Sequence, residues 1–176
     1  TVGGDFFDFF RVDEKHWGLA VADVAGKGIP GALIMAMTRA VLRAESRDTL
    51  SPSTVLKRVN ERVRVDTQDS VFITLTYGIL NVQTAKLTFV RAGHEPMVVM
   101  NAKEGRFELI KPEGIALGLV SGETFSCIEE HEMNLGKGDA ILLYTDGVVE
   151  AMNQKSEEYG RDRLMVHLRS VNCVTA

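Results

Sequence analysis

The sequence GGDFFDFFRVDEKHWGLAVAD, residues 3–23, is where the expected fold can first be worked out. Residues 5–12 form an apolar and aromatic run, and residues 16–23 form a second one after a short polar turn. Two strand-like runs joined in this way predict an antiparallel hairpin. At the open end of the hairpin each strand carries a carboxylate. Asp5 lies next to two glycines, and Asp23 ends the second run.

Helical sequence follows the hairpin. A glycine-rich turn, residues 26–31, precedes a predicted helix from Ala32 to about Ser46. This helix is rich in Ala, Met and Leu and carries little charge, so we expect it to be buried. Ser51 as N-cap and Pro52 at the first helical position predict the start of a second helix.

Strands dominate the rest of the chain until Asp146. The predicted strands are residues 71–79, 86–92, 97–101, 106–111, 124–134 and 139–144. After Asp146 the pattern turns helical, with Leu164, Leu168 and Val171 in one stripe. Short turns between strands favour antiparallel pairing. We therefore predict two mainly antiparallel sheets packed together and flanked by helices.

Composition limits the classes of function. The chain has 176 residues, enough for one domain, and its formal charge of −4 gives no basic footprint for nucleic acid. No apolar run approaches the ~18 residues that span a bilayer, so no membrane contact is expected. Cys127 and Cys173 lack paired spacing, which predicts reduced thiols in a cytoplasmic protein. Because the chain opens at Thr1 without a methionine, we expect it to be cut from a longer protein.

Three aspartates, Asp5, Asp23 and Asp146, lie at the ends of apolar strands beside or near glycine. Single aspartates in such places usually serve as turn or cap residues. Three of them together indicate a cation, because buried carboxylates are costly unless their charge is neutralised. Hard oxygen ligands favour Mg²⁺ or Mn²⁺ over zinc.

Other motifs have competing interpretations. Residues 26–31 match the dinucleotide fingerprint G-x-G-x-x-G, but Asp48 does not end a second parallel strand as that fingerprint requires. The glycines can instead serve a tight turn and close helix packing. Residues 3–7 are similar to the GG(D/E)EF motif of diguanylate cyclases, although Phe6 replaces an acidic residue. His94 fits either a turn histidine or a catalytic residue.

Five short motifs occur together in a fixed order. They are GGDFFD (3–8), DVAGKG (23–28) followed by AL (32–33), AGHEP (92–96), LGL (117–119) and YTDGVVEA (144–151). In this order they resemble the bacterial metal-dependent protein phosphatases, the PPM or protein phosphatase 2C-like family. The similarity is to the branch of sporulation stage II protein E and the phosphatases that regulate stress sigma factors.

The resemblance implies an α-β-β-α sandwich with two metal ions, Mn²⁺ or Mg²⁺. Asp23 would bridge both ions, Asp5 and the backbone carbonyl of Val24 would complete one site, and Asp146 would join the other. A metal-bound water would attack the phosphate without a protein nucleophile. The resemblance also places further residues as outer-shell or switch positions: Asp8, Gly26, Gly28, His94 and Gly147.

The resemblance further implies the reaction and its partners. We expect hydrolysis of phosphoserine or phosphothreonine on a signalling protein such as an anti-sigma-factor antagonist, gated by an upstream sensor or receiver domain. Residues 1–176 would form a single partial domain, because the leading strand and the final strand with its Asp-Asp metal ligand are not found. The alternative is a catalytically impaired phosphatase-like interaction domain, and a nucleotide-cyclising enzyme is a third option.

Overall fold

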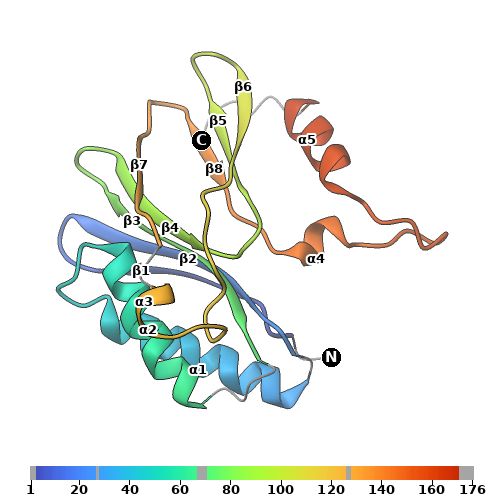
Figure 1. Ribbon diagram of the computed structural model, residues 1–176. Helices are drawn as coiled ribbons and strands as arrows, with labels where there is room; N and C mark the ends of the chain where they lie inside the picture. The colour runs from blue at the N-terminus through green and yellow to red at the C-terminus, as the bar shows by residue number, and fades with distance from the viewer. Residues whose placement is uncertain (1–2, 27, 67–70, 126–127, 171–176) are drawn as a thin grey trace. The chain divides into compact units, whose positions relative to one another are not determined.

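Two antiparallel sheets organise the chain in the computed structural model, which describes residues 3–26, 28–66, 71–125 and 128–170 (Figure 1). They belong to two compact units. The first unit comprises Thr1–His94 and Pro112–Asn134, and the second comprises Glu95–Lys111 and Leu135–Ala176. The fold class predicted from sequence, two mainly antiparallel sheets with flanking helices, is confirmed.

The first unit contains a five-stranded sheet in the order β1-β2-β3-β4-β7, with all neighbouring strands antiparallel. The strands are β1 (Phe6–Arg11), β2 (His16–Val24), β3 (Ile73–Asn81), β4 (Lys86–Ala92) and β7 (His131–Asn134). The predicted hairpin is confirmed, with a register that pairs Phe6 with Ala22 and Arg11 with Trp17.

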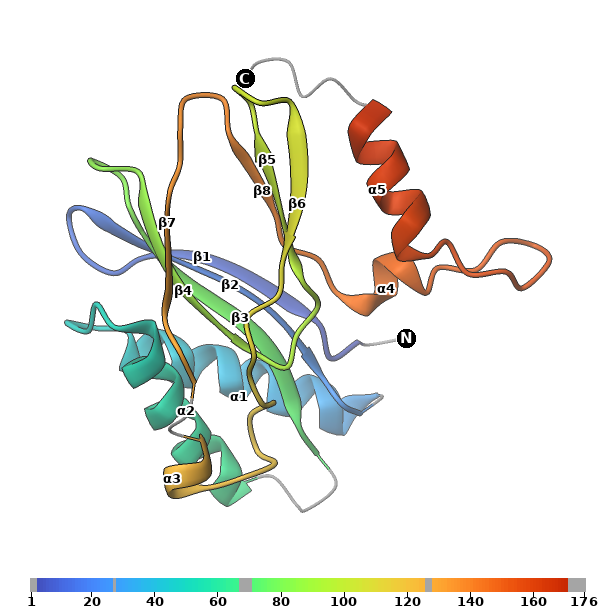
Figure 2. The ribbon, with the colours of Figure 1, turned by 45° about the horizontal axis from the view of Figure 1, so that its top comes forward.

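Helices α1 (Ile29–Glu45) and α2 (Pro52–Asp66) lie along one face of this sheet (Figure 2). A short helix, α3 (Gly122–Phe125), joins the same core. Buried side chains from both layers meet there, including Leu42 of α1, Val59 of α2 and Tyr77 of β3. The predicted cap of α2 is confirmed, because the backbone N–H of Thr54 donates to the Ser51 hydroxyl at 3.2 Å.

Strand β1 alternates strictly between a buried and an exposed face. Its helix-facing side carries Phe6, Asp8 and Phe10. Asp8 is only 6% exposed, and the Arg43 guanidinium donates to both of its carboxylate oxygens at 2.6 Å. Arg39 adds an ion pair at 3.1 Å. Two cations therefore offset the cost of burying this carboxylate and tie β1 to α1.

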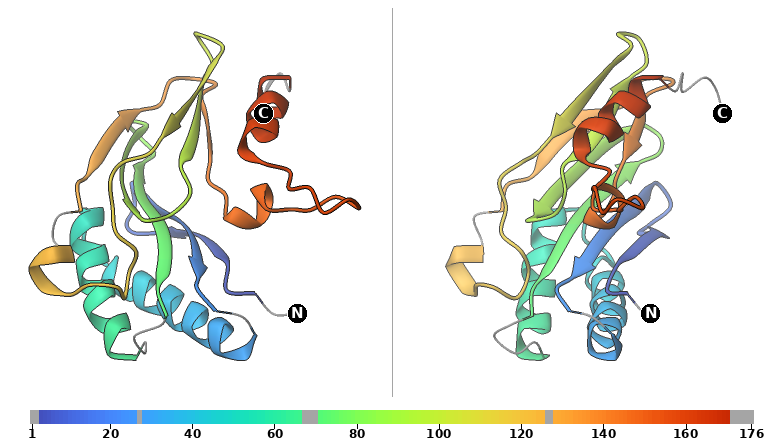
Figure 3. Two further views of the ribbon diagram at one scale, coloured as in Figure 1. Left: turned by 45° about the vertical axis from the view of Figure 1, so that its right-hand side comes forward. Right: turned by 90° about the vertical axis from the view of Figure 1, so that its right-hand side faces the viewer.

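The second unit contains a three-stranded sheet in the order β6-β5-β8 (Figure 3). Its strands are β5 (Met97–Asn101), β6 (Arg106–Ile110) and β8 (Ala140–Leu142), followed by helices α4 (Asp146–Val149) and α5 (Arg161–Ser170). Val98, Tyr144 and Leu164 form its buried core. Among the described residues, no helix combines the length and apolar composition needed to cross a bilayer.

Two predictions about local structure are wrong. The strand predicted over residues 124–134 is a helical turn, α3, followed after a gap in the described residues by β7, which begins only at His131. Phe125 of the helical turn and Ile128 after it both belong to the buried core. Helix α1 begins at Ile29, not Ala32, and it is not buried throughout, because Leu33 is 65% exposed. Cys127, Cys173 and Val171 lie outside the described residues.

Replacing Asp8 should cost stability in a pH-dependent way. Burial alone would raise the pKa of this carboxyl, but hydrogen bonds and charge from Arg43 and Arg39 hold the pKa below its ordinary value. Its stabilising effect is therefore present above the ordinary pKa and is lost as the pH falls through the lowered one. We expect Asp8→Asn to lose about 2 kcal/mol at pH 7, less than for a fully buried pair because both arginines are half-exposed.

Urea unfolding of the wild type and Asp8→Asn at pH 7 and at pH 3 measures this effect. The difference in unfolding free energy should shrink at the lower pH. Asp48→Asn is the matched control, because Asp48 is exposed in a left-handed conformation that asparagine also adopts. A difference between Asp8→Asn and the wild type that stays constant with pH would contradict the assignment.

Candidate metal centre

One end of the β1–β2 hairpin brings the first two predicted metal ligands together. A Cβ atom added to Gly4 would lie 2.7 Å from the carbonyl oxygen of Val24, so the two backbones touch there. The two backbones thus stay close together past Phe6 and Ala22, the last residues paired in the strand register. Asp5, between Gly4 and Phe6, therefore lies opposite Asp23. Only glycine at position 4 permits this approach.

Strand alternation decides which way these side chains face. Phe6 and Ala22 belong to the core beneath the sheet, so Asp5 and Asp23 lie on the face away from α1 and α2. Asp5 is exposed and Asp23 is half-buried. Asp8 lies on the helix-facing side, where Arg39 and Arg43 bind it. Sequence reasoning did not identify these two arginine partners.

The donor set at this sheet end fits a hard divalent cation. Two carboxylates and the Val24 carbonyl supply oxygen only, as Mg²⁺ and Mn²⁺ prefer. Asp146, the third predicted carboxylate, begins α4 in the second unit and is half-buried, and the neighbouring Gly147 is exposed. Among the described residues, no group of three or more His, Cys, Asp or Glu side chains is arranged as a metal cluster.

The glycine-rich loop connects this end of β2 to α1. A Cβ atom on Gly31 would lie 2.7 Å from the Gly26 carbonyl oxygen, so the first turn of α1 packs directly on the loop. Gly28 precedes the helix at its N-terminus. The predicted switch positions Gly26 and Gly28 thus lie between the Val24 carbonyl and α1, while Lys27 lies outside the described residues.

His94 is placed near Asp23 by its contact with a second strand. The imidazole is 3% exposed, and its Nδ1 shares a 2.8 Å hydrogen bond with the Thr74 hydroxyl. Thr74 pairs directly with Asp23 in the register between β2 and β3. One signal for Thr74 was visible in the sequence, where this polar residue alternates with apolar ones, but that pattern did not predict the pairing partner.

Charged side chains of the second unit act on Tyr144, which lies two residues before Asp146. Arg161 at the start of α5 donates to the Glu95 carboxylate at 2.7 Å. Burial raises the pKa of the nearby Tyr144 hydroxyl, although the Arg161 guanidinium acts in the opposite direction. These three residues anchor the segment that leads into Thr145 and Asp146.

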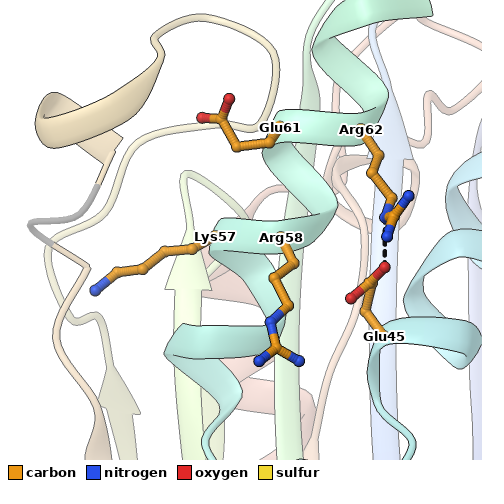
Figure 4. Close-up of a pocket in the computed structure, with 5 residues that line it drawn as sticks. All are labelled: Glu45, Lys57, Arg58, Glu61 and Arg62. Carbon is orange, nitrogen blue, oxygen red and sulfur yellow. Dashed lines mark hydrogen bonds and ion pairs between the residues drawn. The ribbon is translucent and has the colours of Figure 1, made fainter.

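A surface hollow between α1 and α2 contains none of the predicted site residues (Figure 4). Both acidic and basic side chains line it, and Arg62 donates to the Glu45 carboxylate. The side chains that line it are Glu45, Lys57, Arg58, Glu61 and Arg62. Because its charges largely offset one another, this hollow offers no clear preference for a ligand of either sign.

Residues 13–175 match the family model described as Stage II sporulation protein E (SpoIIE). The chain belongs to the SpoIIE family. It is 34% identical over 153 residues to the phosphoserine phosphatase RsbU of Bacillus subtilis (strain 168), an alignment that covers 87% of this chain and 44% of RsbU.

Solved structures agree with this assignment at the level of the fold. The PP2C phosphatase domain of SpoIIE from Bacillus subtilis, solved with a fragment of its regulatory domain, gives a TM-score of 0.80 at 19% identity and covers 98% of this chain and 49% of that one. A structure of RsbU and RsbW domains from Mycobacterium tuberculosis gives 0.79 at 24% identity, covering 97% and 46%. This SpoIIE-family chain therefore spans less than half of each of these relatives.

Adding Mn²⁺ should stabilise the folded protein through Asp5 and Asp23. At a Mn²⁺ concentration 100 times the dissociation constant, binding to the folded state alone adds about 2.7 kcal/mol. For a chain of this size, that corresponds to a rise in melting temperature of roughly 5–10 °C. Asp5→Asn and Asp23→Asn should each remove most of the rise, because each deletes a charged oxygen ligand.

Thermal melts with and without millimolar Mn²⁺ measure this shift. Asp48→Asn, which removes a carboxylate from the surface, should keep the full rise of the wild type. An unchanged melting temperature of the wild type in Mn²⁺ would show that the aspartates do not hold the ion.

Proposed function

We propose that this chain is a divalent-metal-dependent protein phosphatase domain that hydrolyses phosphoserine or phosphothreonine on a signalling protein. The observation that carries the proposal is the placement of Asp5 opposite Asp23, beside the Val24 carbonyl. Membership of the SpoIIE family supports the same reaction, because a relative in the comparison is named a phosphoserine phosphatase. Residues 1–176 would act as one phosphatase domain within a longer protein.

Four oxygen donors have roles in this proposal. Asp23 would bridge two ions of Mn²⁺ or Mg²⁺, Asp5 and the Val24 carbonyl would complete one site, and Asp146 would complete the other. When bound, the ions supply a water of lowered pKa and positive charge for the phosphoryl oxygens. The protein itself orients these donors, and no side chain needs to become covalently phosphorylated.

The rigid parts of the first unit suit this task. The contact between Gly4 and Val24 fixes the spacing of the two strand ends, and the Asp8 ion pairs hold β1 against α1. Metal ligands on paired strands lose little conformational freedom when the ions bind. The exposed Asp5 carboxylate also leaves this sheet end accessible to a phosphorylated side chain.

The proposed substrate is a serine- or threonine-phosphorylated anti-sigma-factor antagonist, as the family resemblance implies. Such a protein would regain the ability to bind its anti-sigma partner once the phosphate is removed. A sensor or receiver domain upstream of this chain would control the rate.

Phosphate release from such a phosphorylated protein, measured with and without Mn²⁺, tests the proposed function. We expect Mn²⁺-dependent release by the wild type and release by Asp23→Asn no faster than by metal-free protein. Asp48→Asn should retain wild-type turnover. Binding of the phosphoprotein without any release of phosphate would instead identify a catalytically impaired interaction domain.

A further inference from the structure

We propose that His94, acting through Thr74, is a positioning residue for Asp23 and so sets the affinity of the metal centre. This inference rests on the proposed function, since it assumes that Asp23 binds the ion. The pairing of β2 with β3 puts Asp23 and Thr74 directly opposite each other. Directly paired side chains share one face of the sheet, with Cβ atoms about 5 Å apart. Asp23 therefore packs beside the Thr74 side chain.

The Thr74 side chain is in turn fixed by His94. Its hydroxyl shares a 2.8 Å hydrogen bond with Nδ1 of the imidazole, which is almost fully buried. A threonine has few χ1 rotamers, and a hydrogen bond to a buried partner selects one of them. The Thr74 side chain beside Asp23 is then held in one orientation.

The backbone around His94 is held as firmly as its ring. Gly93 has φ +68°, and a Cβ atom there would lie 3.1 Å from the backbone nitrogen of Ala116. Arg91 donates one hydrogen bond to the His94 carbonyl oxygen and another to the Pro112 carbonyl at 3.1 Å. The conformation of the turn that carries the imidazole toward Thr74 is thus fixed by contacts with the surrounding chain.

The expected role is one of orientation, because His94 reaches Asp23 only through another side chain. Changing residues that orient metal ligands typically lowers metal affinity by about 10–100-fold. The fold itself should tolerate the loss of this hydrogen bond. Strand β3 is held by backbone pairing with β2 and β4 along most of its length, and the Thr74 hydroxyl is only one side-chain group on it. Metal affinity and folding stability should therefore respond differently to substitution.

Strand β3 provides a matched pair of variants. Thr74→Val removes the hydroxyl that bonds to His94 and keeps the shape of the side chain. Thr76→Val makes the same change two residues along on the same face, where the buried hydroxyl has no hydrogen-bond partner among the described residues. Both variants should fold, and only the first should disturb Asp23.

Isothermal titration with Mn²⁺, together with the Mn²⁺ dependence of phosphate release, measures the effect. We expect the dissociation constant to rise about 10–100-fold in Thr74→Val and by less than about threefold in Thr76→Val. Thr74→Ser should restore affinity, because it restores the hydroxyl. At saturating Mn²⁺ the kcat of Thr74→Val should return close to that of the wild type.

A second substitution tests the histidine directly. His94→Asn keeps a polar group near the position of Nδ1 and should weaken Mn²⁺ binding less than His94→Leu. The effects of Thr74→Val and His94→Leu should not add in the double variant, because both remove the same hydrogen bond. If His94→Leu fails to fold, the comparison of Thr74→Val with Thr76→Val still decides the question.

The outcomes separate the two proposals. Equal Mn²⁺ affinity in Thr74→Val and Thr76→Val, with a wild type that binds Mn²⁺ and releases phosphate, would overturn the positioning role alone. A wild type that binds no Mn²⁺ would overturn both the metal centre and the role of His94. A fall in melting temperature of metal-free Thr74→Val without any change in Mn²⁺ affinity would assign the hydrogen bond to folding only.

Discussion

The pairing of β1 with β2 is the constraint on which the first unit depends. Close contact between Gly4 and the Val24 carbonyl fixes the register at the open end of the hairpin, and alternation then assigns every side chain of β1 to a face. Asp5 is directed to the same side as Asp23, and Asp8 to the side of α1. A slip of one residue would exchange these positions, burying Asp5 among apolar groups and exposing Phe6. The same register therefore determines both the candidate metal centre and the attachment of the helix.

The carboxylates on the two faces of the five-stranded sheet have different surroundings. On the helix side, the buried Asp8 carboxylate is tolerated because two arginines of α1 surround it, and the Arg43 guanidinium also lies over the Phe10 ring. On the opposite side, Asp23 lies beside Thr74. Asp5 is exposed on this side, so a cation can reach it from solvent. A buried carboxylate bound by two arginines and an exposed carboxylate thus occur three residues apart in the sequence, at Asp8 and Asp5. The Asp8 contacts therefore connect α1 to β1, the strand that directly follows Asp5.

Sequence patterns predicted most elements, because alternation and capping are local properties. Apolar runs separated by short polar turns predicted the strands of both sheets, and Ser51 predicted the start of α2. Helix α3 was missed because a single turn is too short to show helical periodicity, and the burial of α1 was overstated because apolar content does not say which side is covered. The partners of Asp8 and Asp23 were not predictable. Arg43 and Thr74 are distant in sequence, and only the tertiary register brings them into contact.

The geometry also weakens the nucleotide-binding interpretations of the two glycine motifs. A dinucleotide fingerprint needs a parallel β-α-β unit, whereas β2 and β3 are antiparallel neighbours on either side of α1 and α2 in sequence. The glycines at residues 26–31 have another use, since Gly31 must approach the Gly26 carbonyl for α1 to begin there. The GGDFF sequence lies at the open end of a hairpin, not at its turn, and Gly4 is needed for contact with Val24. Both motifs are therefore explained by close approaches of the backbone, of Gly4 to the Val24 carbonyl and of Gly31 to the Gly26 carbonyl. The Val24 carbonyl is also an oxygen that a divalent cation would use.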